Sequence, residues 1–395
     1  MAGLLKGKRV LIGVSGGIAI YKMLSLLSML NKEGAETEVI MTDGAKEFVT
    51  PLTFQTMSKH RVHSFLFSEE DGWIPHIDIT RRNDVFLIAP ATANVIAKLA
   101  NGIADDLLTA AALASTCPIL VSPAMNVVMY KNEATQKNIE ILRERGMQII
   151  EPGSGLLACN EIGDGRLPEP EELLEVLNDF FTEKDLKGKK ILITAGATRE
   201  RLDPVRFLTN DSSGRQGIAI ALSAKRRGAD VTLIHGHIDV TVLKGIDSVK
   251  IESTEELLNS VKKNFENSDA LIMAAAPSDY RPENAADNKI KKDGTYSDLI
   301  LTLKENPDII KTVAKNKGNR KVIGFAAETE NLLEYGNKKL VEKNLDYIVC
   351  NDVSKAGAGF NGNTNIVVIL GKNYKQEYPK MTKMEVADKI LDLLV

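Results

Sequence analysis

The amino-acid sequence predicts an α/β protein of two domains, each built on a doubly wound parallel sheet. A basic lead-in and apolar run, Leu5–Ile12 (LKGKRVLI), returns almost unchanged as Leu186–Ile193 (LKGKKILI). A continuous apolar run is typical of a strand buried on both faces of a parallel sheet. In both halves a Gly/Ser-rich turn, a helical stretch ending in Gly-Ala (Gly34-Ala35, Gly228-Ala229) and a second apolar strand follow. The same βαβ unit therefore opens each half of the chain.

Further strands are expected in both halves, because short apolar runs bounded by turn residues recur. The stretch 167–186, rich in Glu, Lys and Pro, is interpreted as a short helix plus linker, which leaves domains over residues 1–166 and 187–395. The other predicted strands are Glu38–Met41, Val85–Ala89, Ile119–Ser122 and Gln148–Ile150 in the first half, and Val231–Ile234, Ala270–Ala276, Val322–Phe325, Tyr347–Asn351 and Ile366–Leu370 in the second.

The composition is that of a soluble globular protein and argues against several classes of function. Among 395 residues, 50 basic and 53 acidic side chains give a net charge of −3, whereas general nucleic-acid or membrane-surface binders carry a basic excess. Lys6, Lys8 and Arg9 interrupt the apolar core that a signal peptide needs, and no apolar run approaches the ~20 residues of a membrane-spanning helix. The three cysteines have no CxxC spacing, so we expect no disulfide framework, no zinc site and a cytoplasmic location.

Small polar residues follow the predicted strand ends of the first half. The turn Gly13–Gly17 (GVSGG) lies between a strand and a helix, where glycines let backbone N–H groups approach a phosphate, although plain tight turns use glycine too. It matches neither GxGxxG nor GxxxxGK(S/T), which lowers the support for a dinucleotide or P-loop site. Two later strands run into Pro90–Asn94 and Pro123–Asn126, and the carboxyl ends of parallel strands share one edge of a sheet. The sequence therefore predicts one crevice at that edge.

His76 and Cys159 are two further candidates in the first half. His76 follows the only tryptophan, Trp73, in a predicted loop, although a lone histidine is more often structural. Cys159 lies in the glycine-rich stretch 153–166, and a thiol in such a stretch is typical of a moving flap, whereas most free cysteines are buried and inert.

Five motifs of the first half resemble, in order, the flavin-dependent cysteine decarboxylases: SGGIA at 15–19, HI at 76–77, APATAN at 89–94, PAMN at 123–126 with Met129, and LAC at 157–159. The particular resemblance is to the phosphopantothenoylcysteine decarboxylase family, and it spans residues 1–166. It implies a flavodoxin-like, Rossmann-like domain that binds FMN at a trimer interface. The residues expected around FMN are Ser15, Gly16, Gly17, Thr42, Thr92, Asn94 and Ala124.

The resemblance also implies catalytic roles. Loss of CO2 from a cysteine carboxylate needs an electron acceptor, and FMN supplies one by oxidising the thiol-bearing carbon to a thioaldehyde. His76 matches the family's general base or charge stabiliser, and Asn126 matches the residue that holds the substrate carboxylate. Cys159 matches the flap thiol that donates a proton in the reductive step. The family usually has glycine after that cysteine, whereas this chain has Asn160, which also tolerates left-handed backbone.

The second half carries extra residues between its first strand and first helix, around 198–213, where α/β folds bind ligands. The segment Ser212–Gly217 (SSGRQG) opens a helix and suits an anionic ligand, although a plain serine N-cap with a solvated arginine would look the same. The lysine run Lys289–Lys292 would be a solvated face in many proteins. Near Asp279 it can also offer a phosphate clamp beside a magnesium ligand.

These blocks, together with NPDI at 306–309, GFAAET at 324–329 and NDV at 351–353, resemble the phosphopantothenate–cysteine ligases over residues 187–395. The domain order is that of bacterial bifunctional enzymes, which use CTP. The resemblance implies that an acyl-cytidylate forms with release of pyrophosphate, after which cysteine displaces CMP. Lys289 would stabilise phosphate charge and Asn210 would orient the acyl intermediate. The residues matched to nucleotide-binding positions are Met273, Ala274, Ala275, Asp279, Lys289, Asn306, Pro307, Asp308, Ile309, Phe325, Lys339 and Lys343, with Asp279 also as a ligand of Mg2+.

Two other interpretations stay open on the residues alone. An NAD-dependent dehydrogenase would also open with βαβ units, although neither half has GxGxxG. A non-catalytic flavoprotein subunit would keep the fold, but the five residues matched to catalytic roles are all present. His235 and His237 have metal-ligand spacing without an evident third ligand. The resemblance implies small-molecule partners (4'-phosphopantothenate, cysteine and CTP), no nucleic acid or membrane, and a homo-oligomer of trimeric flavin domains and dimeric ligase domains, up to a dodecamer.

Overall fold

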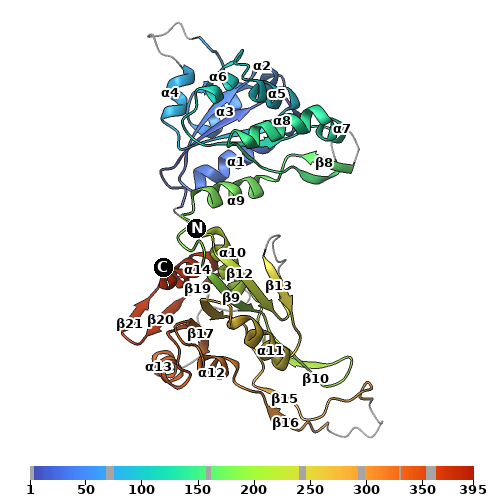
Figure 1. Cartoon of the computed structure of the whole chain (residues 1–395), viewed down its shortest axis with the longest axis vertical. Coiled ribbons are helices and arrows are strands. Elements are labelled where there is room, and N and C mark those ends of the chain that lie inside the picture. The colour runs from blue at the N-terminus through green and yellow to red at the C-terminus, as the bar shows by residue number, and fades with distance from the viewer. Residues whose placement is uncertain are drawn as a thin grey trace. The chain divides into compact units, whose positions relative to one another are not determined.

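A computed structural model describes residues 4–67, 75–156, 162–239, 246–291, 299–328, 331–352 and 362–395. The chain divides into two compact units, Met1–Thr182 and Glu183–Val395 (Figure 1). Each unit has its own sheet and its own hydrophobic cores. Within the described ranges, no helix combines the length and the apolar character needed to cross a membrane.

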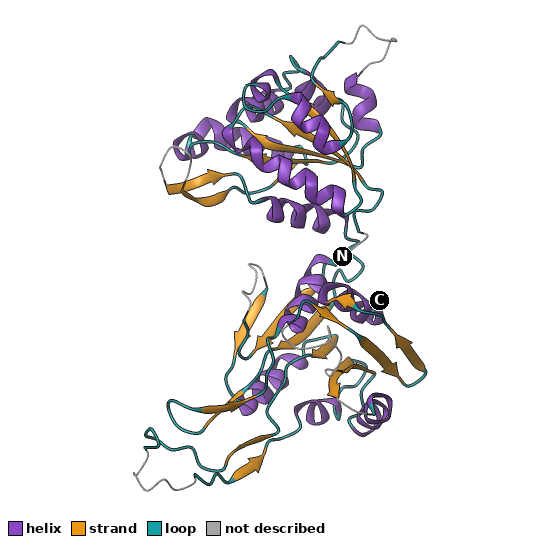
Figure 2. Ribbon diagram, turned by 180° about the vertical axis from the view of Figure 1, so that it is seen from behind, coloured by secondary structure: helices purple, strands orange, loops and turns teal. Residues whose placement is uncertain are grey.

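The first unit is a six-stranded parallel sheet with helices on both faces (Figure 2). The strand order is β3-β2-β1-β4-β5-β6, and every neighbouring pair is parallel. Because the order reverses between β1 and β4, a crevice forms beyond the carboxyl ends of these two strands. The strands are β1 Arg9–Val14, β2 Glu36–Met41, β3 Val62–His63, β4 Val85–Ala91, β5 Ile119–Pro123 and β6 Gln148–Ile149, and a separate antiparallel hairpin is formed by β7 Gly153–Leu156 and β8 Ile162–Arg166.

Helices cover both faces of this sheet because its strands are apolar on both sides. Val10, Ile12 and Val14 of β1 pack with α1, α3 and α9, whereas Leu11 belongs to the core that α4, α5, α6 and α8 form on the other face. The doubly wound fold predicted for the first half is confirmed. The helices are η1 Ile18–Ile20, α1 Tyr21–Lys32, α2 Asp43–Lys46, α3 Pro51–Ser58, α4 Pro75–Arg81, α5 Ala93–Asn101, α6 Leu107–Leu113, α7 Val127–Lys131, α8 Glu133–Glu144 and α9 Pro170–Phe181.

The stretch 167–186 is interpreted from the sequence as a short helix plus linker, and the structure has a helix there. Most of this stretch is α9, which packs along α1 in the first unit. Leu173 and Leu177 of α9 are fully buried in the core that they share with α1. Two apolar side chains four residues apart lie on one face of a helix and need a core to bury against. The amphipathic helix therefore belongs to the first unit, and the division falls after Thr182.

A network of paired charges lies near the amino-terminal edge of the first sheet. The Glu38 carboxylate on β2 accepts hydrogen bonds from Arg82 Nε (2.8 Å) and Nη2 (2.5 Å) and lies 3.4 Å from His63 Nε2. Burial alone raises the pKa of Glu38, but the hydrogen bonds and charges of His63 and Arg82 lower it to about 2. Arg9 and Glu36, paired at 3.2 Å, are both more than half exposed. The inner network therefore holds β2 to β3 and to the turn before β4.

The second unit has an eight-stranded sheet in the order β13-β12-β9-β14-β17-β18-β20-β21. The strands from β13 to β18 are parallel, as predicted, and the switch point lies between β9 and β14. The strand predicted at Ile366–Leu370 is present but runs antiparallel to β18, and a two-residue connection joins it to β21, as only antiparallel strands allow. The strands are β9 Lys190–Ala195, β12 Asp230–His235, β13 Asp247–Lys250, β14 Ala270–Met273, β17 Lys321–Glu328, β18 Tyr347–Asp352, β20 Val367–Gly371 and β21 Tyr374–Glu377.

Helices also cover both faces of the second sheet, with α10 and α14 on one face and α11, α12 and α13 on the other. The first of these, α10, approaches β9 very closely because Gly217 has no side chain. A Cβ atom at Gly217 would lie 2.5 Å from the Cβ of Ala195. The helices are α10 Arg215–Arg226, α11 Thr254–Phe265, α12 Ile309–Ala314, α13 Leu332–Glu342, α14 Lys383–Leu391 and η2 Asp392–Leu394.

Short antiparallel ribbons complete the second unit. The extra residues around 198–213 form one of them, in which β10 pairs with β11, and β10 also lies beside β15 of a second ribbon. Both ribbons project from the large sheet in Figure 1. The ribbon strands are β10 Arg199–Arg201 with β11 Phe207–Thr209, β15 Tyr280–Pro282 with β16 Leu303–Glu305, and β19 Thr364–Asn365 with β22 Met381–Thr382.

We expect Glu38→Gln to destabilise the first unit by about 3 kcal/mol at pH 7, because each unit of pKa lowering corresponds to about 1.4 kcal/mol. A lowered carboxyl pKa stabilises the fold above its ordinary value. The difference from the wild type should therefore shrink below pH 4.5 and be lost as the pH falls through about 2. Urea denaturation of the full-length chain, read by pulsed hydrogen exchange on β2 peptides, measures this effect. The control Glu36→Gln, from the exposed pair, should cost less than ~1 kcal/mol, and equal losses in both variants would contradict the prediction.

Candidate functional site

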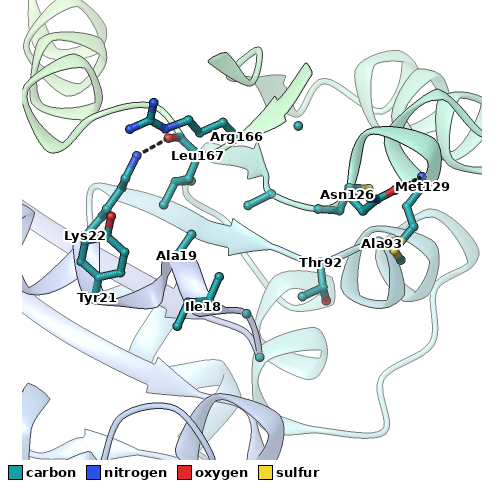
Figure 3. A pocket seen from close by; sticks show the side chains of 15 residues that line it. Ile18, Ala19, Tyr21, Lys22, Thr92, Ala93, Asn126, Met129, Arg166 and Leu167 are labelled. Carbon is teal, nitrogen blue, oxygen red and sulfur yellow. Dashed lines mark hydrogen bonds between the residues drawn. The ribbon is translucent and has the colours of Figure 1, made fainter. Parts of the chain in front are cut away.

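A pocket of about 660 Å3 lies at the switch point of the first sheet (Figure 3). It is formed by the turn after β1, the starts of α1 and α5, the residues between β5 and α7, and the end of β8. This volume falls within the ~300–1,000 Å3 typical of small-molecule and cofactor sites. The crevice predicted from the strand ends is therefore present at the carboxyl edge of the sheet.

Five residues predicted from the motifs line this pocket: Gly16, Gly17, Thr92, Ala124 and Asn126. They come from the ends of three neighbouring strands, β1, β4 and β5. The sheet order thus brings together segments that are far apart in the sequence.

Thr92 and Asn126 each begin a helix at the pocket. The Thr92 hydroxyl accepts a hydrogen bond from the Val95 N–H (3.3 Å) at the start of α5, and Asn126 Oδ1 accepts one from the Val128 N–H (2.7 Å) at the start of α7. These capping bonds hold both side chains in place at the pocket wall. Figure 3 shows both residues on the same side of the cavity, near Ala93 and Met129.

Ser15 is also predicted to lie at the cofactor. Its side chain connects two turns next to the pocket. Its side chain is buried, its hydroxyl donates a hydrogen bond to the Pro90 carbonyl (2.7 Å), and the same oxygen accepts one from the Thr92 N–H (3.1 Å). Ser15 therefore ties the turn after β1 to the turn after β4, and positions Thr92.

Gly16 allows a third turn to pack against the pocket turn. A Cβ atom at Gly16 would lie 2.8 Å from the backbone carbon and oxygen of Gly44. Gly44 belongs to the short helix α2, which Thr42 caps by accepting a hydrogen bond from the Ala45 N–H (3.3 Å). Thr42 itself is not among the residues that line the pocket, and neither is the exposed Asn94.

The structure does not bring His76 into this pocket. His76 lies in the first turn of α4, on the face of the sheet that α6 and α5 share. Its Nδ1 atom is buried and has no hydrogen-bond partner among the described residues. Cys159, the predicted flap thiol, lies outside the described residues.

The sequence did not predict that the end of β8 and the buried Lys22 form one side of the pocket. Lys22 of α1 is buried and lines the pocket, and its Nζ donates hydrogen bonds to the Leu167 carbonyl (2.7 Å) and to Glu169 Oε1 (3.0 Å). Arg166 Nη2 donates to the same Glu169 oxygen at 2.6 Å, and Figure 3 shows Lys22, Arg166 and Leu167 together at one end of the cavity. The only signal in the sequence was a lysine directly beside the apolar positions of α1, starting at Met23.

In the second unit, Asn306 links the two segments that follow β14. Asn306 is buried, its N–H donates to the Asp279 carbonyl (2.8 Å), and its Nδ2 donates to the Ser278 carbonyl (2.9 Å). Arg281 Nη1 donates to Asn306 Oδ1 at 2.6 Å. The predicted nucleotide segments at 273–279 and 306–309 are therefore adjacent in the structure.

Lys343 joins the same group of residues from the end of α13. Its Nζ lies 2.9 Å from Asp308 Oδ2, while Asp308 Oδ1 caps α12 by accepting from the Lys311 N–H (3.0 Å). Among the other predicted nucleotide residues, Met273 and Ile309 are buried, Ala274, Ala275, Phe325 and Lys339 are half-buried, and Pro307, Asp279 and Lys289 are exposed.

Asn210 and Lys289 are held by the ribbons at the same edge. Asn210 Nδ2 donates to the Pro277 carbonyl (2.9 Å), just beyond β14. The residue after Lys289, Ile290, donates its N–H to Oδ2 of the buried Asp203 (3.1 Å) and accepts at its carbonyl from Arg206 Nη1 (3.0 Å). Asp203 and Arg206, to which sequence reasoning assigned no role, thus anchor the segment that carries Lys289.

Arg215, expected at an anionic ligand, is bonded within the protein. Its Nη1 donates to Asn363 Oδ1 (2.9 Å), and its Nη2 lies 3.3 Å from Asp239 Oδ2. Lys383 lies buried nearby at the start of α14. Burial and the charge of Arg215 lower the pKa of Lys383 to about 8, against the opposing effect of Asp239.

Comparisons with known proteins match both units. The chain matches the Flavoprotein family over residues 2–182 and the DNA/pantothenate metabolism flavoprotein C-terminal domain over residues 186–395. The coenzyme A biosynthesis bifunctional protein CoaBC of Bacillus subtilis (strain 168) is 45% identical over 395 residues, covering 98% of this chain and 97% of that protein. CoaBC of Escherichia coli (strain K12) is 41% identical, with 99% and 97% covered. The crystal structure of a CoaBC C-terminal domain is 40% identical, covers 54% of this chain and 96% of that chain, and superposes with a TM-score of 0.46.

Two Rossmann-like domains, one with a cofactor-sized pocket at its switch point, define a two-domain flavoprotein. The chain belongs to the family of bifunctional coenzyme A biosynthesis proteins, CoaBC. It is an enzyme with a decarboxylase and a ligase role. The function predicted from the sequence motifs is thereby confirmed at this level.

We expect Gly16→Ala and Gly17→Ala to separate folding from ligand binding. A methyl group at position 16 meets the Gly44 backbone, so Gly16→Ala should destabilise the first unit by about 1–3 kcal/mol and lower its flavin content. At position 17 the nearest neighbour would be Thr92 Cγ2 at 4.0 Å, so Gly17→Ala should keep the stability of the flavin-free chain and weaken flavin binding alone. Thermal unfolding of the flavin-free chain and flavin titration measure the two effects. Equal stability losses in both variants would be inconsistent with this assignment.

Proposed function

We propose that residues 187–395 join cysteine to 4'-phosphopantothenate with CTP, through an acyl-cytidylate, and that residues 1–166 then decarboxylate 4'-phosphopantothenoylcysteine to 4'-phosphopantetheine with FMN. The observation that carries this proposal is the pocket at the first switch point, which is lined by Gly16, Gly17, Thr92, Ala124 and Asn126, all from the decarboxylase motifs. Family membership over both units supports the presence of both activities on one chain.

The residues around the pocket fit FMN. The turn at Gly16 and Gly17 exposes backbone to the cavity without side chains, which suits close approach of a flat ring or a phosphate. Ile18 and Met129 supply apolar surface for the ring system, and Thr92 supplies a hydroxyl. When bound, FMN supplies the electron acceptor that the decarboxylation requires.

In the decarboxylase reaction, we assign to Asn126 the binding of the substrate carboxylate. Asn126 lines the pocket, and the cap at α7 fixes the plane of its amide, so that the NH2 group is a directed donor. Cys159 is assigned the proton donation at the reductive step. Strand β8, which follows Cys159 in the sequence, is anchored beside the pocket, where the Met125 N–H donates to the Gly165 carbonyl at 3.0 Å.

His76 is assigned to the pocket of a neighbouring copy of the chain, where it would act as general base or stabilise charge. Two observations support this assignment. His76 does not line the pocket of its own unit. The pocket is bordered by apolar side chains that remain exposed in the single chain, such as Ile18 (59%), Tyr21 (57%) and Met129 (49%). A homo-oligomer, with trimeric flavin domains as the resemblance implies, would complete the site and cover this surface.

In the ligase reaction, Lys289 stabilises phosphate charge during attack of the carboxylate on CTP, and Asn210 orients the acyl intermediate for attack by cysteine. Asp279 would hold Mg2+ together with the triphosphate, a common arrangement in which the protein contributes one or two carboxylates. Asp279 is exposed, and its carboxylate has no hydrogen-bond partner within the described part of the chain. No cluster of three or more His, Cys, Asp or Glu able to hold a metal is found among the same residues.

The remaining expectations stay predictions. We propose small-molecule substrates, dimeric ligase domains and a cytoplasmic location for this enzyme, in keeping with its family and with the near balance of 50 basic and 53 acidic residues.

The direct test is to incubate the purified chain with 4'-phosphopantothenate, cysteine, CTP and Mg2+, and to follow the products by mass. A flavin spectrum together with 4'-phosphopantetheine, CO2, CMP and pyrophosphate is the expected result. Accumulation of 4'-phosphopantothenoylcysteine would refute the decarboxylase half alone, and a colourless protein without CTP turnover would refute the whole proposal.

Single substitutions should separate the two activities. We expect His76→Asn to slow decarboxylation of supplied 4'-phosphopantothenoylcysteine by about 10²–10⁴-fold, with CMP release unchanged. Lys289→Gln should slow CMP release by about 10²–10³-fold, with decarboxylation of the supplied intermediate unchanged. His60→Asn and Lys338→Gln, which change exposed residues outside both sites, serve as matched controls. Loss of both activities in either site variant would argue against separate catalytic centres.

A further inference from the structure

The second unit contains another pocket, of about 420 Å3, that the proposed function does not use. It is lined by Arg199 and Arg201 of β10, the Gly236–His237 turn after β12, the end of β13 and the start of α11. These elements lie on the β12–β13 side of the switch strand β9. The segments matched to nucleotide positions lie at and after the end of β14, on β17, and at α12 and α13 or beside them, on the other side of β9. The pocket is therefore a second half of the crevice at this sheet edge.

Three basic side chains in this pocket, those of Arg199, His237 and Lys250, form no ion pair with any residue that the structure describes. The Arg199 guanidinium stacks on the Phe207 ring, 4.3 Å from its centroid, and its Nε is buried without a hydrogen bond to any described residue. The side chains of Lys250 and His237 likewise make no hydrogen bond or ion pair within the described ranges, and both are exposed to the pocket or to solvent. A buried guanidinium nitrogen without a hydrogen bond, such as Arg199 Nε, is uncommon in proteins unless a ligand completes it.

The acidic side chains of the pocket, in contrast, are already bonded. Glu252 Oε1 accepts a hydrogen bond from Arg201 Nε at 2.8 Å, and Glu256 Oε2 accepts one from the Glu252 N–H at 2.7 Å. The lining thus has three permanent cations, Arg199, Arg201 and Lys250, against two carboxylates. Arg201 pairs with Glu252, which leaves Arg199 and Lys250 against Glu256, so the net charge of the lining is positive.

We propose that this pocket is an anion subsite that binds a phosphate monoester, with Arg199 and Lys250 as its charged ligands. A guanidinium presents planar donors that match phosphate oxygens, and the Phe207 ring holds the plane of Arg199 in place. An ammonium group such as that of Lys250 adds a compact second charge.

The geometry favours the phosphate of 4'-phosphopantothenate, the acid substrate of the ligase, as the group that binds in this pocket. This identification of the ligand rests on the proposed function. That substrate carries a carboxylate, which is activated on the nucleotide side, and a phosphate at its other end. Asn210, assigned to the acyl group, follows Thr209, and Thr209 pairs with Arg199 across the β10–β11 ribbon. One ribbon therefore connects the acyl position with the pocket. Free phosphate or pyrophosphate has the same chemistry and is the alternative ligand for the pocket.

The first test uses the full-length holoenzyme and separates the two substrates. We expect Arg199→Gln and Lys250→Gln each to raise the KM for 4'-phosphopantothenate about tenfold, the size of one lost charge-assisted contact, with the KM for CTP unchanged. Glu256→Gln keeps the acceptor oxygen for the Glu252 N–H, removes a negative charge, and should lower the same KM. The control Arg320→Gln removes another arginine that stacks on a ring, 5.3 Å from the centroid of Phe265, but outside the pocket, and should change neither KM.

The second test measures binding of inorganic phosphate to the same proteins by calorimetry, without nucleotide. Weaker phosphate binding in Arg199→Gln and Lys250→Gln, together with the KM change, assigns the subsite to the acid substrate. Weaker phosphate binding with an unchanged KM assigns it to a free anion. If neither quantity differs from the wild type, the subsite is overturned. A wild-type chain without CTP turnover would refute the proposed ligase reaction, while the phosphate titration would still decide the subsite.

Discussion

The close approach of backbone segments at the carboxyl edges of two buried sheets is the constraint on which both sites depend. Strands covered by helices on both faces leave that edge as the place where a ligand can reach the chain. Backbone segments there pack against each other without side chains between them, as Gly16 does on Gly44 and as Gly217 of α10 does on Ala195 of β9. In the first unit this packing opens a cavity, and in the second it sets the start of α10 directly above β9.

Charge pairing distinguishes the structural networks of this protein from its candidate binding surfaces. Glu38, Arg82 and His63 satisfy one another, and the cost of burying them is offset by their hydrogen bonds. The pocket at β10 has the opposite character, because its carboxylates are bonded while Arg199 and Lys250 are not bonded to any other described residue. Side chains of similar type thus stabilise the fold in one place and remain available for an anion in the other.

The two units show how one sheet design carries two different chemistries. Each begins with the same βαβ unit, and each forms its crevice between the first strand and the fourth parallel strand of its sheet. The differences come from antiparallel insertions: the β7–β8 hairpin forms a wall of the first pocket, and the β10–β11 and β15–β16 ribbons carry or anchor Asn210, Asp279 and Lys289. The sheets position the sites, and the insertions supply much of their chemistry.

The sequence by itself determined the repeated α/β units, the strands around both switch points, and the motifs that meet in the first pocket, because buried parallel strands and their glycine turns are local patterns. Only the tertiary structure decided that the helix 170–181 packs in the first unit and that Ser15 accepts a hydrogen bond from the Thr92 N–H. It also decided that Lys22 bonds the Leu167 carbonyl and that Asp203 bonds the Ile290 N–H, beside the two sites. These outcomes depend on contacts between residues far apart in the chain, which no local pattern encodes. The same reason explains why the sequence did not reveal Arg199, whose buried Nε has no hydrogen bond to any described residue.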